Sequence, residues 1–158
     1  MKSVLTAILC WATVLGILGA QPAQAHRRDC FGSLRAALAK GGYSGGLDCY
    51  TDKMAIKIRP LGAINVGLWR YRIYQLNYHF KPVPGNDNTH WGERLLVFDR
   101  RGRYLGQYGV INYDDRFRIV GHTLLSNQPA KDGNRIIFTP SGLPGAAWLD
   151  GEDHSLFR

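Results

Sequence analysis

The sequence predicts an α+β fold: one N-terminal helix packed on a curled, mainly antiparallel β-sheet of six to seven strands, stapled by a disulfide. Three observations support this prediction. One segment near residue 30 has helical periodicity, and the rest of the chain is a series of short runs rich in β-branched and aromatic residues. The connections between these runs are short and contain no second helix for crossovers, so the strands are expected to pair antiparallel.

Residues 1–25 have the three-part pattern of a secretory signal peptide. Lys2 supplies a positive charge, an apolar run extends from Val4 to Ala20, and Ala23-Gln24-Ala25 places small residues before the predicted cut. The threonines and glycines within the run argue against a membrane anchor, which needs about 20 strongly apolar residues. We therefore expect residues 26–158 to form a single globular domain that is exported, periplasmic or secreted, with no transmembrane segment after signal cleavage.

The helix is predicted from Asp29 to Lys40, where apolar residues recur at three- and four-residue steps, and Gly41-Gly42 ends it. Cys30 lies on this helix, and Cys49 is the other cysteine that remains after the signal segment. Because exported chains with an even number of cysteines usually oxidise them, we expect a Cys30–Cys49 disulfide. Such a loop is worth roughly 3 kcal/mol in the chain-entropy model. A metal-binding or catalytic pair is the alternative, and it lacks a Cys-x-x-His partner.

The predicted strands follow the helix and are joined by turn signals. They are 54–58, 69–80, 95–98, 104–108, 117–125, 135–138 and 148–149, with a tail near 156–157. The alternation within 69–80 changes phase at Ile73-Tyr74, which indicates a bulge or burial on both faces. Asp99-Arg100-Arg101-Gly102 fits a type I turn with a glycine bulge, and Asp150-Gly151 is a second hairpin signal.

The longest predicted loop, residues 82–93, holds His90 and Glu93, which have the residue types of an acid–base pair. The alternative is a polar hairpin loop without catalytic function. His122 is a further catalytic candidate, although a structural histidine at a core edge is the favoured interpretation for it and for His79. No catalytic site is assigned from the sequence.

Residues 150–154 gather three carboxylates and a histidine, the oxygen and nitrogen donors that divalent metals use. The segment lacks the spacing of an EF-hand loop, and a hairpin turn naturally collects aspartate and glycine. The sequence therefore predicts no metal and no cofactor.

The chain is basic, with 20 Lys and Arg against 12 Asp and Glu and a net charge of +8. Arginine predominates, and its guanidinium group pairs bidentately with phosphate and carboxylate. Scattered charges also serve solubility, which is the alternative interpretation. The residues predicted to bind a ligand are Trp69, Arg70 and Arg72 on one strand and Arg100, Arg101 and Arg103 at a hairpin tip.

These features favour a small, exported, basic binding or envelope-associated protein without catalytic activity, acting as an inhibitor or as a binder of anionic ligands. The expected partner is an anionic envelope component or an exported protein, and nucleic acid is less favoured. No Gly-x-Ser-x-Gly, His-Glu-x-x-His, phosphate-loop or Cys-x-x-Cys motif occurs. The alternative function is a small secreted hydrolase that needs no metal, either nuclease-like or directed at glycans.

Overall fold

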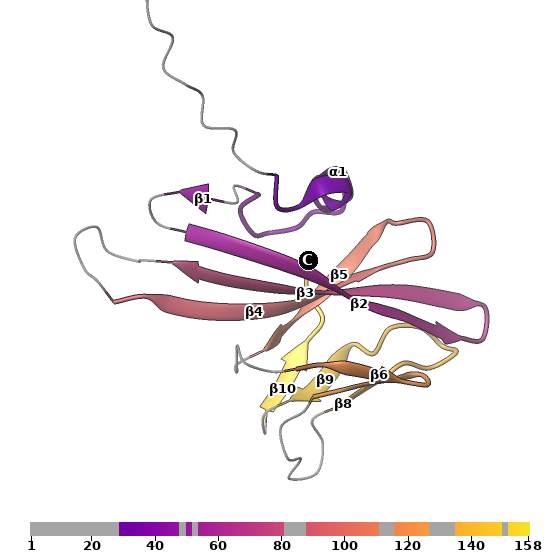
Figure 1. Ribbon diagram of the computed structural model, residues 1–158. Helices are drawn as coiled ribbons and strands as arrows, with labels where there is room; N and C mark the ends of the chain where they lie inside the picture. Colours follow the sequence, from indigo (N-terminus) through magenta and orange to yellow (C-terminus); the bar gives the residue numbers. More distant parts are fainter. Residues whose placement is uncertain are drawn as a thin grey trace, which may run out of the picture.

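A computed structural model describes residues 29–47, 50–51, 54–80, 88–110, 116–126, 135–149 and 152–158. Within these residues it contains two antiparallel five-stranded sheets and one short helical segment (Figure 1). The predicted α+β fold, with six or seven strands in one sheet curled over a helix, is therefore wrong. The protein is mostly β, because the short strands after residue 116 pair with one another in a sheet of their own.

The first sheet is a meander of hairpins in which each strand pairs with the next along the chain. Its order is β1 (Tyr50–Thr51), β2 (Met54–Val66), β3 (Trp69–Phe80), β4 (His90–Phe98) and β5 (Tyr104–Val110). The strand predicted at 69–80 is confirmed. The pairing register shifts between Pro60 and Gly62 of β2, opposite Tyr74 and Ile73. The bulge thus lies on the partner of β3, at the position where the alternation of β3 changes phase.

The second sheet is built from strands of three or four residues. Its order is β10 (Glu152–Ser155), β9 (Ala146–Leu149), β8 (Arg135–Ile137), β7 (Thr123–Leu125) and β6 (Arg118–Val120). The single strand predicted over 117–125 is in fact a hairpin, because the chain turns at Gly121, whose φ is +59°. The predicted turn at Asp150-Gly151 lies outside the described residues.

The helical segment consists of a 3₁₀ turn, η1 (Gly32–Leu34), followed by α1 (Arg35–Lys40). It is shorter than the predicted 29–40 helix. The carboxylate of Asp29 accepts hydrogen bonds from the N–H group of Phe31 at 3.1 Å and from the side chain of Arg35 at 3.0 Å. These bonds fix the chain where it enters the segment.

Cys30 is disulfide-bonded in the structure. Its predicted partner, Cys49, lies outside the described residues, so the pairing stays a prediction.

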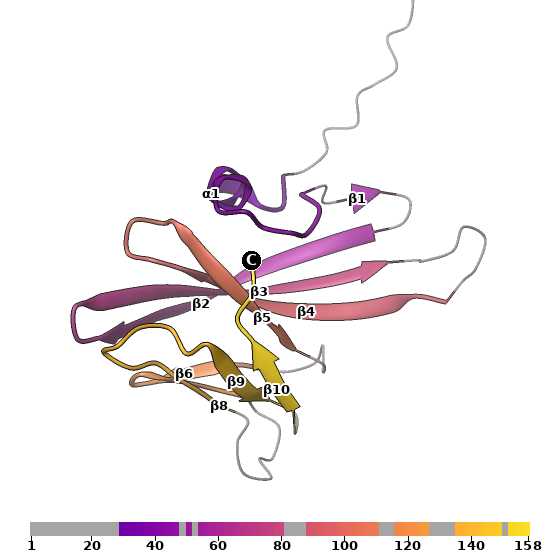
Figure 2. The same cartoon turned by 180° about the vertical axis from the view of Figure 1, so that it is seen from behind.

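The first sheet is the middle layer of the molecule, with the helical segment on one side and the second sheet on the other (Figures 1 and 2). Side chains alternate between the two faces along each strand. The core between the sheets includes Ile64, Tyr71, Ile73, Leu95, Val97, Tyr108, Leu124, Ile136, Phe138 and Leu149. The core on the helix side contains Phe31, Leu38, Ile56, Leu76, Leu96, Phe98 and Tyr104.

None of the helices in the described part of the chain is long and apolar enough to cross a membrane. The predicted signal peptide, residues 1–25, lies outside that part. Its assignment therefore stays a prediction from the sequence.

The two cores predict that adjacent leucines of β4 are equally important for stability. Leu95 faces the second sheet and Leu96 faces the helix, and neither is exposed. Leu95→Ala and Leu96→Ala should each lower the free energy of unfolding by about 2–5 kcal/mol in urea titrations. Leu68→Ala, at an exposed position, is the control and should change stability by less than ~0.5 kcal/mol. A Leu95→Ala variant as stable as this control would contradict the two-sided burial of the sheet.

Candidate anion-binding site

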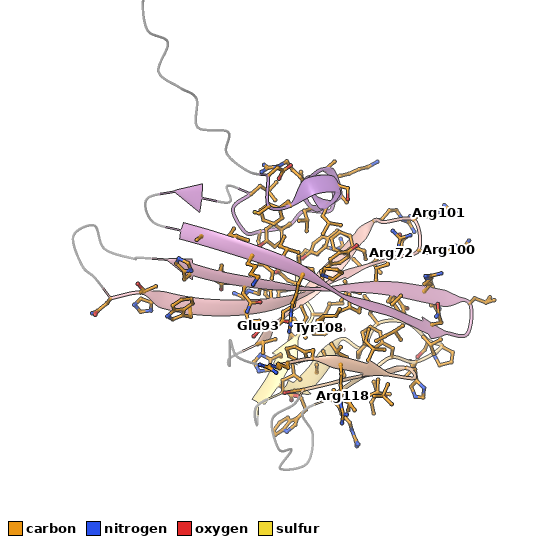
Figure 3. The ribbon with its side chains drawn as sticks, viewed as in Figure 1. Arg72, Glu93, Arg100, Arg101, Tyr108 and Arg118 are labelled. Atoms are coloured by element: carbon orange, nitrogen blue, oxygen red, sulfur yellow. The ribbon has the colours of Figure 1, made fainter. Side chains whose placement is uncertain are left out.

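The two groups of predicted binding residues, about 30 positions apart in the sequence, lie at the same end of the first sheet. Strand β3 pairs with β4, and Arg72 is opposite Phe98. The start of β3 therefore lies beside the turn that follows β4. A guanidinium N–H of Arg72 donates to the carbonyl oxygen of Arg100 at 3.4 Å. Figure 3 shows Arg72, Arg100 and Arg101 gathered near this turn.

The turn between β4 and β5 is organised by the buried carboxylate of Asp99. Its Oδ1 accepts hydrogen bonds from the backbone N–H groups of Arg101 at 2.8 Å and Arg103 at 2.9 Å. Its Oδ2 accepts from Nε of Arg103 at 2.6 Å. Gly102 has a φ of +77° and donates its N–H to the carbonyl oxygen of Asp99 at 3.0 Å. The predicted turn at 99–102, with its glycine in the left-handed region, is confirmed.

Asp99 compensates only one of the arginines at this end of the sheet. Burial opposes ionisation of its carboxyl group, but the hydrogen bonds from Arg103 and Arg101 outweigh burial and hold the pKa below its ordinary value. Asp99 is therefore ionised at neutral pH and forms an ion pair with Arg103. Within the described residues, no carboxylate pairs with the four other arginines of the two groups. These are Arg70, Arg72, Arg100 and Arg101.

A pocket of about 440 Å³ opens among these side chains, and we call it the arginine-lined pocket. Its lining consists of Leu68, Trp69, Arg70, Asp99, Arg100, Arg101 and Arg103. Leu68 is 95% exposed and Trp69 is 46% exposed. The indole of Trp69 stacks on the ring of Tyr71, with centroids 6.1 Å apart, and donates its N–H to the carbonyl oxygen of Pro140 at 3.0 Å. The pocket thus combines cationic side chains with an aromatic wall that is held by a hydrogen bond and with an exposed apolar side chain.

The structure corrects the predicted placement of the catalytic candidates His90 and Glu93. Both lie on β4 and not in a loop. Because residues three apart on a strand point to opposite faces, the two side chains do not face one another. Glu93 is only 1% exposed, whereas His90 is exposed. The two residues that the sequence suggests as an acid–base pair therefore lie on opposite faces of β4.

His122 is also exposed and lies in the turn between β6 and β7, not within a strand. Its carbonyl oxygen accepts a hydrogen bond from the N–H of Phe138 at 3.0 Å. His79 packs against Trp91, with ring centroids 4.8 Å apart. None of the described pockets is lined by two of the three catalytic candidates His90, Glu93 and His122. Within the described residues, no group of three or more metal-ligating side chains gathers.

Two polar residues on the helix side of the first sheet, Arg94 and Gln107, are not among the site residues predicted from the sequence. Arg94 lies directly before the apolar run of β4, and Gln107 lies in the middle of β5. Both line a pocket on the helix side of the sheet. Each could have been found in the sequence as a charged or amide side chain within an otherwise apolar strand. Burial of such a side chain costs free energy unless it forms hydrogen bonds, so its presence there indicates a role.

Comparison with known proteins finds no matching family model, curated protein or solved structure.

The role of Asp99 predicts a pH-dependent stability difference between the parent protein and Asp99→Asn. The variant keeps the shape of the side chain but loses the ionised acceptor, and its free energy of unfolding at pH 7 should fall by about 1–3 kcal/mol. Because the folded pKa of Asp99 is lowered, its contribution is present above the unfolded pKa of about 3.9 and is lost as the pH falls through the folded value. Urea unfolding of both proteins between pH 7 and pH 2 should show this difference shrinking below about pH 4. A difference that does not change with pH would refute the ionic role.

Proposed function

We propose that the protein is an exported binding protein that attaches to anionic phospholipid surfaces of the cell envelope through the arginine-lined pocket and Arg72. The observation that carries the proposal is a group of four arginines, next to a nearly fully exposed leucine, with which no carboxylate pairs in the part of the chain that the structure describes. Export rests on the signal-peptide pattern of residues 1–25.

The charges at this end of the sheet suit phosphate groups. A guanidinium group presents a planar set of donors that matches phosphate oxygens bidentately. Asp99 is occupied by Arg103, so it does not neutralise Arg70, Arg100 or Arg101. A basic side chain near an anionic membrane surface contributes roughly 1 kcal/mol, so the four arginines contribute about 4 kcal/mol at moderate salt.

The apolar residues favour a lipid surface over a soluble anion. Leu68 follows Gly67 in the turn between β2 and β3, where its side chain is 95% exposed. Trp69 follows it, and tryptophan favours the interface between membrane and water. Full removal of a leucine side chain from water is worth about 1.5–3 kcal/mol. Leu68 and Trp69 thus lie beside the arginines. Apolar side chains that insert into the membrane and cations that attract anionic lipids are the two kinds of group that a peripheral membrane protein uses.

Vesicle binding tests this proposal. The protein with residues 26–158 should co-sediment with vesicles of phosphatidylglycerol and phosphatidylcholine, and not with vesicles of phosphatidylcholine alone. A quadruple variant, Arg70→Gln, Arg72→Gln, Arg100→Gln and Arg101→Gln, should bind anionic vesicles at least tenfold more weakly. Leu68→Ser should also weaken vesicle binding, while it leaves the salt-dependent binding of a soluble polyanion such as heparin unchanged.

The matched control removes four positive charges elsewhere. It replaces exposed basic residues by glutamine at Lys40, Arg116, Arg118 and Arg135. This variant has the same net charge as the test variant and should keep most of the vesicle binding. Equal loss in the two variants would show that bulk charge drives the interaction, and the proposed site would be wrong. Unchanged vesicle binding by Leu68→Ser would exclude insertion of the turn into the membrane, and absence of vesicle binding by the parent protein would overturn the proposal.

A further inference from the structure

A second pocket, of about 220 Å³, lies on the helix side of the first sheet, and we call it the Arg94 pocket. Its polar groups come from Arg94, Gln107 and Ser44, and its aromatic walls come from Tyr43, Tyr78 and Phe157. No acidic residue is among the described residues that line it. It is separate from the arginine-lined pocket, because the two share no lining residue.

The guanidinium group of Arg94 is half-buried between two rings. It lies 5.8 Å from the centroid of Tyr78 and 5.1 Å from that of Phe157. Within the described residues it donates no hydrogen bond and forms no ion pair, although a guanidinium carries five N–H donors. Gly109 pairs with Arg94 across β5, and a Cβ there would lie 2.8 Å from Nη1 of Arg94. The glycine therefore leaves the space that the guanidinium occupies.

Gln107 offers a hydrogen-bond acceptor to the same pocket. Its side chain is 2% exposed, and its Nε2 donates to Oγ of Ser44 at 3.4 Å. Its Oε1 is buried and accepts no hydrogen bond from the described residues. A buried acceptor that lacks a donor is unfavourable, so a ligand that supplies an N–H or O–H would gain from pairing with it.

Tyr43 does not supply the negative charge that Arg94 lacks. Burial raises the pKa of the Tyr43 phenol, and the opposing effect of Arg94 does not reverse the shift. The phenol is therefore neutral at physiological pH. Arg94 remains the one charged side chain among the described residues of the pocket.

We propose that the Arg94 pocket binds a small carboxylate with an aromatic or apolar body. One guanidinium matches the single charge of a carboxylate and its two coplanar oxygens. The rings of Tyr78 and Phe157 and the aliphatic side chains of Ile56 and Leu76 pack against the body of the ligand. Gln107 accepts a hydrogen bond from a hydroxyl or amino group on that body. The volume lies below the range of about 300–1,000 Å³ typical of drug-sized ligands, so the ligand is small.

Calorimetric titration with benzoate, its neutral analogue benzamide and 4-hydroxybenzoate tests the assignment. Benzoate should bind at least tenfold more tightly than benzamide, and 4-hydroxybenzoate should bind more tightly than benzoate. Arg94→Gln should weaken benzoate binding at least tenfold. Gln107→Glu, which is nearly isosteric, places a carboxylate in the same pocket and should abolish binding. Arg100→Gln is the control at the other site and should bind benzoate as the parent does.

Gly109→Ala keeps every charge but displaces the Arg94 guanidinium, so it should also weaken benzoate binding. If Arg94→Gln does not fold, Gly109→Ala serves as the test of the role of Arg94. Circular dichroism and thermal unfolding establish folding for each variant. Benzoate binding that is unchanged in folded Arg94→Gln, Gln107→Glu or Gly109→Ala would overturn the proposal. The proposal would also be overturned if the parent protein did not bind benzoate, or if it bound inorganic phosphate through Arg94 and did not bind benzoate. These variants leave the arginine-lined pocket intact, so vesicle binding tests the other site independently.

Discussion

Burial of the first sheet on both faces is the constraint on which the rest of the structure depends. In β4, Leu95 and Val97 pack against the second sheet, while Leu96 and Phe98 pack on the helix side. A strand covered on both faces needs a continuous apolar run in place of simple alternation. This need explains Leu95–Phe98 and the change of phase in β3. The sheet is the middle of three layers. The helical segment of nine residues covers one of its faces, and the second sheet, built from very short strands, covers the other.

Both candidate sites lie where this covering ends. At the hairpin end of the sheet, the turns after β2 and β4 extend past the core and present Leu68 and the arginines to solvent. On the helix side, the layer formed by α1 and the following segment leaves a gap beside Arg94 and Gln107. The first site is open and lined by exposed arginines, which suits a large anionic surface. The second is small and walled by rings, which suits one charged group on a compact ligand.

The charge balance of the chain makes such sites possible. With 20 basic and 12 acidic residues, the chain has too few carboxylates to give each basic side chain one of its own. The fold determines which ones. Asp99 is held in its turn by three hydrogen bonds and pairs with Arg103, so the neighbouring arginines keep their charge available. Arg94 is surrounded by aromatic rings and not by acids. Both sites have guanidinium groups that lie near apolar side chains and form no ion pair among the described residues. These groups support binding of anions more directly than the arrangement of the described histidines does.

By itself, the sequence determined the features that depend on neighbouring residues. The turn at Asp99–Gly102 and the strand Trp69–Phe80 follow from turn chemistry and β-propensity, and the structure confirms both. Tertiary structure decided the features that depend on pairing between distant segments. The sequence predicts strands at 117–125, 135–138 and 148–149, but their assembly into a second sheet depends on pairing between these segments and on packing against the first sheet. The extension of β4 back to His90 separated His90 from Glu93, and the register of β3 against β4 placed Arg72 beside Arg100. Strand register and layer packing are long-range properties, and residue spacing along the chain does not encode them.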